Sequence, residues 1–253
     1  MQMIPPVLHF IWINRGRLFG QGEYHALRTA IRNTSYQVIL HTDLNEDTET
    51  APDSNPYALL GIDDKFVIKK ETFRTDLAVS AASLSDLYRL EILHREGGIY
   101  SDMDIIWLRD IPVDMNARLF GAWENQSYKC AVNGLFGMEQ GYPGIPDLIK
   151  SLLDELRRKK KVTHWVFFKP TTLFIKSHAD VMLPQKLFFR NGWRRIGRLL
   201  QHEGVELPEE LTKQLGTSAV QKLRFDHIVG FHWYAYYFKW SDIAARLPAG
   251  LLE

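Results

Sequence analysis

The stretch from Ser80 to Asp104 constrains the fold of this chain more than any other part of the sequence. Residues 80–96 are rich in Ala, Leu, Glu and Arg and contain neither Gly nor Pro, which predicts a helix. Gly97-Gly98 follows, and glycine commonly ends helices. Because the next residues are strand-like, we expect a helix, a glycine turn, a short strand and the acidic pair Asp102 and Asp104 in direct succession.

The segments on either side predict alternating strands and helices. Residues 7–13 and 36–42 are short apolar runs, typical of buried strands, and residues 22–32 between them indicate a helix. Further strands are expected at 105–107, 119–123 and 131–138, and an amphipathic helix at 145–161. This order is typical of an α/β domain with a partly parallel sheet, and no repeat or linker divides residues 1–253.

Composition excludes several classes of protein. The 253 residues are 45% hydrophobic and 24% charged, as in globular domains, which excludes disorder, collagen and coiled coil. A formal charge of +1 provides no global field that favours nucleic acid or a membrane. Cys130 is the single cysteine, so no disulfide forms within the chain. Since no apolar run reaches roughly 18 residues and no cleavage site is evident, we expect a cytoplasmic protein.

The acidic pair has the chemistry of a metal site. In an extended strand, side chains two residues apart share a face, so Asp102 and Asp104 are able to converge on one cation such as Mg²⁺ or Mn²⁺. An ion held by carboxylates and completed by phosphate oxygens is a common way to bind a nucleoside diphosphate. Aspartates in a turn are also often solvated or capping residues, so the tripeptide alone leaves both interpretations open.

Asp86 and Arg89 lie three residues apart in the predicted helix and therefore share one face of it. They form either a surface ion pair or, beside a cleft, a pair that binds sugar hydroxyls and oxyanions. Asn133 and Gly134 lie inside an apolar strand. Strands avoid these two residue types unless a backbone or a ligand comes close. A β-bulge is the alternative explanation for these two residues.

Together these residues resemble the glycosyltransferases that have a DXD-containing sugar-binding region. This family includes yeast initiating mannosyltransferases, bacterial capsule and lipopolysaccharide sugar transferases and, more distantly, clostridial glucosylating toxins. The shared pattern is Ser-Asp-x-x-Arg at 85–89, Gly-Gly-Ile-Tyr at 97–100, one residue, and Asp-x-Asp at 102–104. The opening strand from Ile4 to Trp12, with Ile-Pro at its start and His-x-x-Trp at its end, is a second match. The resemblance covers about residues 4–140.

The resemblance implies a GT-A-type nucleotide-sugar transferase fold, with a central mixed, mostly parallel sheet flanked by helices. It also implies a metal-dependent reaction that moves a sugar from a nucleoside-diphosphate sugar to a hydroxyl of a glycan or lipid-linked acceptor, with retention of anomeric configuration. Residues 4–140 would form the donor-binding core and 141–253 the acceptor side and closing tail. A nucleoside-diphosphate-sugar hydrolase and a non-catalytic glycan-binding module remain the alternatives.

The resemblance also implies roles for individual side chains. Trp12 would stack on the nucleotide base, Asp86 and Arg89 would bind the donor sugar, and Tyr100 would lie beside sugar or ribose. Asp102 would contact ribose or sugar and the metal, Asp104 would ligate the metal directly, and Asn133 would touch the transferred sugar. Core packing is the alternative for the two aromatic residues. Nothing in this set identifies the donor base, the sugar or the acceptor.

The C-terminal part resembles the family's closing region less clearly. His232 is the expected third metal ligand, with His227 as alternative, because an imidazole is acceptable to Mn²⁺ where Mg²⁺ prefers oxygen. A histidine packed in an aromatic core is the competing interpretation. Two basic clusters, at 157–161 and at Arg190, Arg194, Arg195 and Arg198, are interpreted as a solvated helix end and as a candidate contact with anionic lipid or a phosphate-bearing acceptor. No nucleic-acid reader module is apparent.

Overall fold

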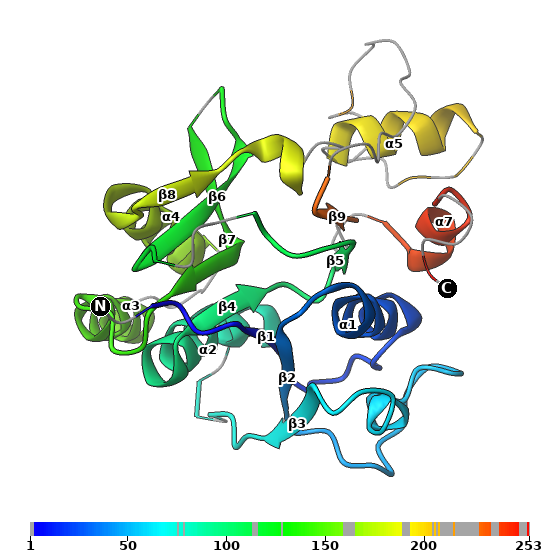
Figure 1. The fold of residues 1–253 in the computed structure, drawn as a ribbon, viewed down its shortest axis with the longest axis horizontal. Helices are drawn as coiled ribbons and strands as arrows, with labels where there is room; N and C mark the ends of the chain where they lie inside the picture. Colours follow the sequence, from blue (N-terminus) through cyan, green and yellow to red (C-terminus); the bar gives the residue numbers. More distant parts are fainter. Residues whose placement is uncertain are drawn as a thin grey trace.

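The computed structural model describes the chain apart from residues 1–2, 75, 78, 113–115, 128, 159–164, 189–192, 204, 206, 208–214, 216–227, 234–237, 248–251 and 253. Its centre is a seven-stranded sheet with the order β3-β2-β1-β4-β7-β6-β8 (Figure 1). Neighbouring strands are parallel except that β7 runs antiparallel to both β4 and β6. The predicted mixed, mostly parallel sheet of a GT-A-type fold is therefore confirmed.

The N-terminal part supplies the parallel half of the sheet. Its elements are β1 (Val7–Trp12), α1 (Gln21–Asn33), β2 (Gln37–Thr42), η1 (Pro56–Leu59), β3 (Phe66–Lys70), α2 (Ala81–Glu96) and β4 (Gly98–Ser101). The strands and helices predicted from residues 7–13, 22–32, 36–42 and 80–96 are all present. The sequence pattern did not identify β3, which forms the edge of the sheet.

The second half completes the sheet and adds a small one beside it. Its elements are β5 (Ile105–Trp107), β6 (Leu119–Asn125), β7 (Cys130–Met138), α3 (Ile145–Arg158), α4 (Trp165–His178), β8 (Val181–Leu183), η2 (Gln185–Leu187), α5 (Trp193–His202), β9 (Gly230–His232) and α7 (Trp240–Ala244). β5 leaves the main sheet and pairs antiparallel with β9. The acidic pair therefore lies at the end of β4, where the chain passes from one sheet to the other.

Two apolar cores hold the layers together. One, containing Phe10 and Leu40, lies on the α1 side of the sheet, and the other, containing Ile11 and Leu87, lies on the side covered by α2, α3 and α4. Alternate residues of β1 enter different cores because successive side chains of a strand point to opposite faces. The sheet is thus covered on both faces, which explains why its parallel strands are almost continuously apolar.

The joint between α2 and β4 follows directly from the local sequence. The Ser80 hydroxyl accepts a hydrogen bond from the Ser83 backbone N–H and so caps the first turn of α2. Gly97 and Gly98 both have positive φ angles, of 69° and 98°, a region that side chains disfavour. These two residues turn the chain sharply from the helix into the sheet. Among the described residues, no helix is long and apolar enough to cross a membrane.

Candidate metal and donor site

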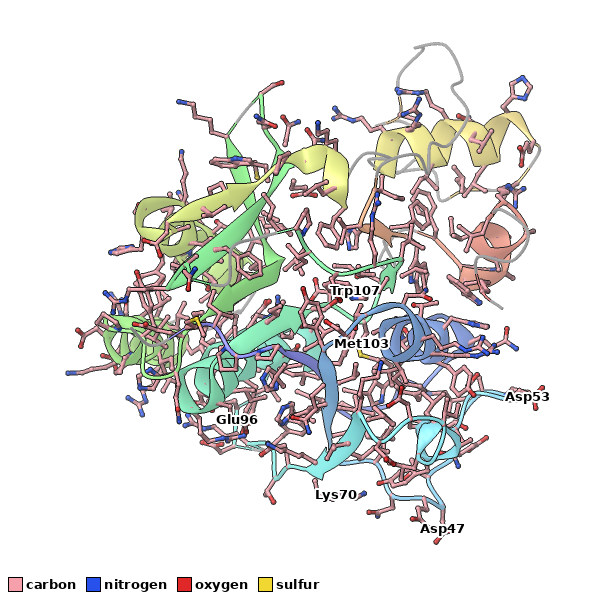
Figure 2. All side chains as sticks on the ribbon, viewed as in Figure 1. Asp47, Asp53, Lys70, Glu96, Met103 and Trp107 are labelled. Atoms are coloured by element: carbon pink, nitrogen blue, oxygen red, sulfur yellow. The ribbon has the colours of Figure 1, made fainter. Side chains whose placement is uncertain are left out.

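The acidic turn lies between β4 and β5, near the middle of the molecule. Figure 2 labels Met103 and Trp107, which lie close to α1, whereas Asp47 and Asp53 lie at the periphery. Asp102 and Asp104 are in a turn and not in an extended strand. The expectation that strand alternation makes the two carboxylates converge is therefore wrong. The turn itself brings them together, because the chain changes direction between the two sheets.

Asp102 is held from three sides. Its carboxylate Oδ1 accepts a hydrogen bond of 2.7 Å from the Tyr100 hydroxyl and lies 3.4 Å from Nη2 of Arg89. Its backbone N–H donates to the Gly134 carbonyl at 2.8 Å. A Cβ atom at Gly134 would lie 2.1 Å from Asp102 Oδ2, so only glycine leaves room for this carboxylate. This close approach explains the glycine inside the apolar strand β7.

Asp104 meets the C-terminal part of the chain. Its Oδ1 lies 2.9 Å from Nε2 of His232, and its carbonyl accepts a hydrogen bond from the Trp233 backbone N–H. The pairing of β5 with β9 places Ile105 opposite His232 and produces this contact. Burial lowers the pKa of His232, but the nearby Asp104 carboxylate outweighs it, and the net pKa is raised.

These three side chains offer the donor set expected of a divalent metal site. One ligand atom from each of Asp102, Asp104 and His232 lies within 4.8 Å of the other two. Two carboxylates and an imidazole suit Mn²⁺, and Gly134 supplies the space beside them. The residues present therefore fit the ion that the sequence implied. His227, the alternative ligand, lies outside the described residues.

Asp86 and Arg89 form a buried pair beneath the acidic turn. Nη2 of Arg89 lies 2.9 Å from Asp86 Oδ1, and Nη1 donates to the Asn133 carbonyl at 2.6 Å. The Asn133 side-chain amide donates to the same carboxylate at 2.8 Å. Both charged residues are less than 10% exposed, so the surface ion-pair alternative is wrong. The Arg89 guanidinium also lies 4.2 Å above the Tyr100 ring, a cation–π contact.

Burial dominates the electrostatics of this pair. Desolvation raises the pKa of Asp86 to about 7, Asp102 adds to the rise, and Arg89 opposes it. Burial alone would lower the pKa of Arg89, but Tyr100, Asp102 and Asp86 outweigh this effect and raise it. Arg89 is thus a permanent cation, and its guanidinium is engaged by neighbouring protein groups. It holds Asp86, Asp102 and the Asn133 backbone in fixed positions.

Trp12 lies at the end of β1 and is 7% exposed. Its ring packs edge-on against Phe19, and the Arg17 guanidinium lies 5.4 Å from its centre. Arg17 also pairs with the buried carboxylate of Glu23, whose pKa burial raises. The described conformation therefore has Trp12 covered rather than open, and core packing explains its position without a ligand.

Two carboxylates near the site were not identified from the sequence. Glu23 lies in the first turn of α1, close enough to Asp104 for their charges to interact. Glu124, near the end of β6, is half-buried and interacts electrostatically with His232, and burial raises its pKa. Both approach the site through strand and helix packing, and no local motif marks them. Only a prediction of the tertiary contacts could have found them.

The described members of the two basic clusters lie on different helices, α3 and α5. Arg157 and Arg158 pair with Asp154 and Glu155 on the exposed face of α3, as at a solvated helix end. Lys159 to Lys161 and Arg190 lie outside the described residues. Arg194, Arg195 and Arg198 lie on α5, where Ile196 and Leu200 are buried.

Comparison with known proteins agrees with this geometry. Residues 24–123 match the family model described as glycosyltransferase sugar-binding region containing DXD motif, a range that includes Asp86, Arg89, Asp102 and Asp104. No curated protein sequence matches the chain.

The chain is similar in fold to solved glycosyltransferase structures. The PaToxG glycosyltransferase is 17% identical, with a TM-score of 0.50, over 85% of this chain and 84% of that one. The apo form of the glycosyltransferase GlyE from Streptococcus pneumoniae is 10% identical, with a TM-score of 0.57, over 91% of this chain and 54% of GlyE. The chain thus spans about half the length of GlyE. The resemblance to glycosyltransferases with a DXD region is confirmed.

Proposed function

We propose that this chain is a metal-dependent glycosyltransferase that moves a sugar from a nucleoside-diphosphate sugar to a hydroxyl of a glycan or lipid-linked acceptor. The observation that carries the proposal is the convergence of Asp102, Asp104 and His232 directly above the buried Asp86 and Arg89 pair. The family match over residues 24–123 supports the reaction class. The donor, the acceptor and the ion remain parts of the proposal.

Asp104 and His232, with Asp102, would hold Mn²⁺ or Mg²⁺. When bound, such an ion neutralises the charge that develops on a departing diphosphate. Tyr100 and Arg89 orient Asp102, and the buried side chains of Asp86 and Asn133 lie beside it with polar atoms suited to sugar hydroxyls. Trp12 would face the base only after Arg17 moves from its ring.

The same geometry bears on the stereochemical course. A double displacement would need a carboxylate free to attack the anomeric carbon. Asp86 does not meet this need, because Arg89 and Asn133 both bind its Oδ1 atom within 3 Å and its pKa is raised. We therefore propose retention by attack of the acceptor on the face that the diphosphate leaves, with a leaving-group oxygen accepting the acceptor proton.

The first test is nucleotide release from a panel of nucleoside-diphosphate sugars with Mn²⁺ or Mg²⁺ and no acceptor. We expect slow release from one donor in the wild type and at least a hundredfold less in Asp104→Ala. Asp47→Ala, an exposed carboxylate far from the site, is the matched control and should keep the wild-type rate. Absence of both metal-dependent nucleotide binding and turnover would contradict the proposal and favour a glycan-binding module.

Adding acceptors to the same assay separates transfer from hydrolysis. A transferase places the sugar on the acceptor and is accelerated by it, whereas a hydrolase releases free sugar at a rate independent of the acceptor. Chromatography of the products with a labelled donor distinguishes the two. If only free sugar forms with every acceptor, the chain is a nucleoside-diphosphate-sugar hydrolase and our proposal is wrong.

A peripheral membrane contact belongs to the same proposal. Arginines 194, 195 and 198 lie on α5, and clustered Arg side chains attract anionic headgroups. Co-sedimentation with vesicles that contain phosphatidylserine tests this, with neutral vesicles as control. We expect salt-sensitive binding to the anionic vesicles alone, and equal binding to both would contradict the contact.

A further inference from the structure

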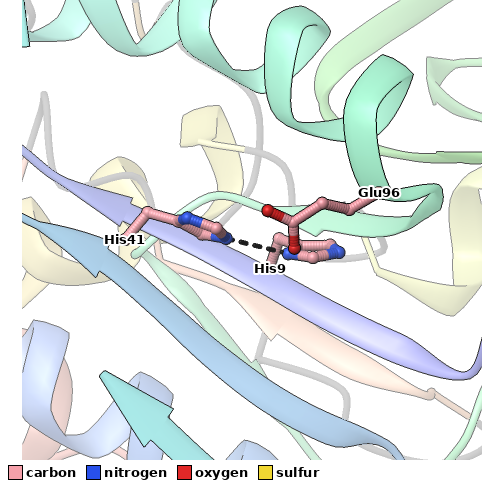
Figure 3. A group of neighbouring side chains, drawn as sticks. All are labelled: His9, His41 and Glu96. Carbon is pink, nitrogen blue, oxygen red and sulfur yellow. Dashed lines mark hydrogen bonds between the residues drawn. The ribbon is translucent and has the colours of Figure 1, made fainter. Parts of the chain in front are cut away.

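A second group of titratable side chains is buried on the α2 side of the sheet, apart from the acidic turn. Figure 3 shows His9 on β1, His41 on β2 and Glu96 at the end of α2. The two histidines are at most 1% exposed. The proposed transfer reaction does not use these residues. Because they are buried, a polar atom among them that lacked a hydrogen bond would destabilise the fold.

The two imidazoles form a continuous chain of hydrogen bonds. His9 Nε2 lies 3.0 Å from the Gly97 carbonyl, His9 Nδ1 lies 3.0 Å from His41 Nε2, and His41 Nδ1 lies 2.8 Å from Glu71 Oε1. A carbonyl only accepts, so His9 Nε2 carries a proton. The pKa of Glu71 is lowered, chiefly by its hydrogen bond with His41, so this carboxylate also accepts and His41 Nδ1 carries a proton.

The middle contact then needs a third proton. Two neutral imidazoles supply two N–H groups, and both are already used at the ends of the chain. Without another proton, His9 Nδ1 and His41 Nε2 would place two lone pairs 3.0 Å apart in a buried site. Burial lowers the pKa of His9 to about 3, with His41 as the next largest cause, so His9 is neutral. Of the two rings, only His41 contacts a carboxylate, that of Glu71, which makes it the ring placed to carry the third proton.

The charged groups around the pair balance one another. Lys69 donates to Glu96 at 2.7 Å, and Arg95 donates to both Glu71 and Glu96 at 2.8 Å. Two carboxylates and two cations cancel, so the hydrogen-bond chain, and not a surplus of negative charge, determines where the proton goes. Glu71 lies in direct contact with His41 and is its counter-ion.

The same contacts speak against a metal ion at this place. Ligand atoms of His9, His41 and Glu96 do lie within 4.8 Å of one another. Both carboxylate oxygens of Glu96, however, already accept hydrogen bonds from Lys69 and Arg95. A metal ion would have to displace these cations, whereas a shared proton uses every contact as it stands.

We propose that His41 is an imidazolium at neutral pH and that this buried cation, through neutral His9, positions the Gly97-Gly98 turn that begins β4. The turn depends on His9 sterically as well, because a Cβ atom at Gly98 would lie 2.8 Å from His9 Nε2. Since β4 leads directly into Asp102, we infer that the pair is a positioning device for the acidic turn. The charge state stands without the proposed function, and only this last step rests on it.

Nitrogen-15 NMR of histidine-labelled wild-type protein at pH 7.5 measures the charge state directly. A monocationic pair has three protonated nitrogens among the four buried ring nitrogens, and a neutral pair has two. We expect three, with both nitrogens of His41 protonated. Two protonated nitrogens would overturn the proposal, whatever the protein's activity.

Unfolding as a function of pH gives an independent readout. Unfolded histidines release their protons near pH 6.5, so in a window that begins at about pH 7 the folded chain would hold one extra proton. The folding equilibrium constant should then fall up to tenfold per pH unit in that window. His9→Gln keeps this slope, because its amide donates to Gly97 and accepts from His41, whereas His9→Phe loses it. Equal slopes in the two variants would contradict the shared proton.

Two controls complete the design. His202→Gln changes an exposed histidine and should leave the slope unchanged. Mn²⁺ affinity should fall in His9→Phe and recover in His9→Gln, and failure of only this readout would overturn the positioning step alone. Metal analysis should find no more zinc in the purified wild type than in His9→Phe. Zinc that is bound to the wild type and absent from His9→Phe would overturn the proposal, because a ring nitrogen cannot both ligate a metal and share a proton.

Discussion

At the scale of single residues, the site depends on small side chains that leave room for charged ones. Gly134→Ala would push a methyl group into Asp102 Oδ2, since the two atoms would lie 2.1 Å apart. We expect at least a tenfold loss of Mn²⁺ affinity while the fold is kept, measured by titration and by circular dichroism. Ser177→Ala is the control, because this side chain is exposed on α4. Unchanged affinity in Gly134→Ala would contradict the placement of Asp102.

Asp86 gives a prediction for the pH dependence of stability. Its pKa is raised to about 7, so the protonated form is favoured in the folded chain relative to an unfolded aspartate near 3.8. The contribution of this raised pKa to the free energy of unfolding is fully present below pH 3.8 and is lost as the pH rises to about 7. Relative to Asp86→Asn, the free energy of unfolding of the wild type should fall by roughly 2–3 kcal/mol between pH 5 and 8.

Urea unfolding of the two proteins at several pH values measures this difference. Asp47→Asn, at an exposed position, should show no such difference from the wild type. A wild type that gains stability relative to Asp86→Asn over the same range would mean that Arg89 keeps the carboxylate ionised, and the sign of the prediction would be wrong.

At the scale of elements, α2 delivers both the Asp86 and Arg89 pair and the turn that precedes Asp102. Ser80→Ala removes the cap at its first turn and should cost about 1 kcal/mol of stability. The helix is fixed by packing along its length, so we expect nucleotide release per folded molecule to stay within twofold of the wild type. Thermal unfolding and the release assay check the two parts. Ser177→Ala, on the exposed face of α4, should not destabilise the protein.

Local sequence signals explain which elements could be predicted. The helix before Gly97, the strand after it and the acidic turn follow one another in the chain, so their arrangement depends on short-range rules of propensity and capping. The departure of β5 from the main sheet depends on its pairing with β9, more than a hundred residues away in the sequence. β3 and β8 are the two short edge strands of the main sheet, and their identity is likewise set by their partners.

The site divides along the same line. Asp86, Arg89 and Asp102 were predicted together, because they lie within one helix–turn–strand unit. The contact of Arg89 with the Asn133 backbone depends on how β7 packs, and the contact of Arg17 with Trp12 depends on the loop between β1 and α1. No motif encodes either contact. Glu23 and Glu124 come from separate elements and carried no signal of function in the sequence.

At the scale of the whole molecule, the proposed metal site joins the middle of the chain to its C-terminal part. Asp104 follows the N-terminal half-sheet, whereas His232 comes from the tail and reaches it through β9. An ion that binds both would stabilise the folded chain by mass action, by about 2.7 kcal/mol at one hundred times its Kd. For a chain of this size, that corresponds to a rise in Tm of roughly 5–10 °C.

Differential scanning fluorimetry with Mn²⁺, Mg²⁺ and EDTA measures this coupling. We expect Mn²⁺ to raise the Tm more than Mg²⁺, because the imidazole of His232 suits Mn²⁺ better. His232→Ala should lose most of the Mn²⁺ shift and reduce the preference between the ions, and Asp104→Ala should lose both shifts. His202→Ala should keep them, since that side chain is exposed on α5. A full Mn²⁺ shift in His232→Ala would mean that the tail does not complete the site and that Asp102 and Asp104 hold the ion alone.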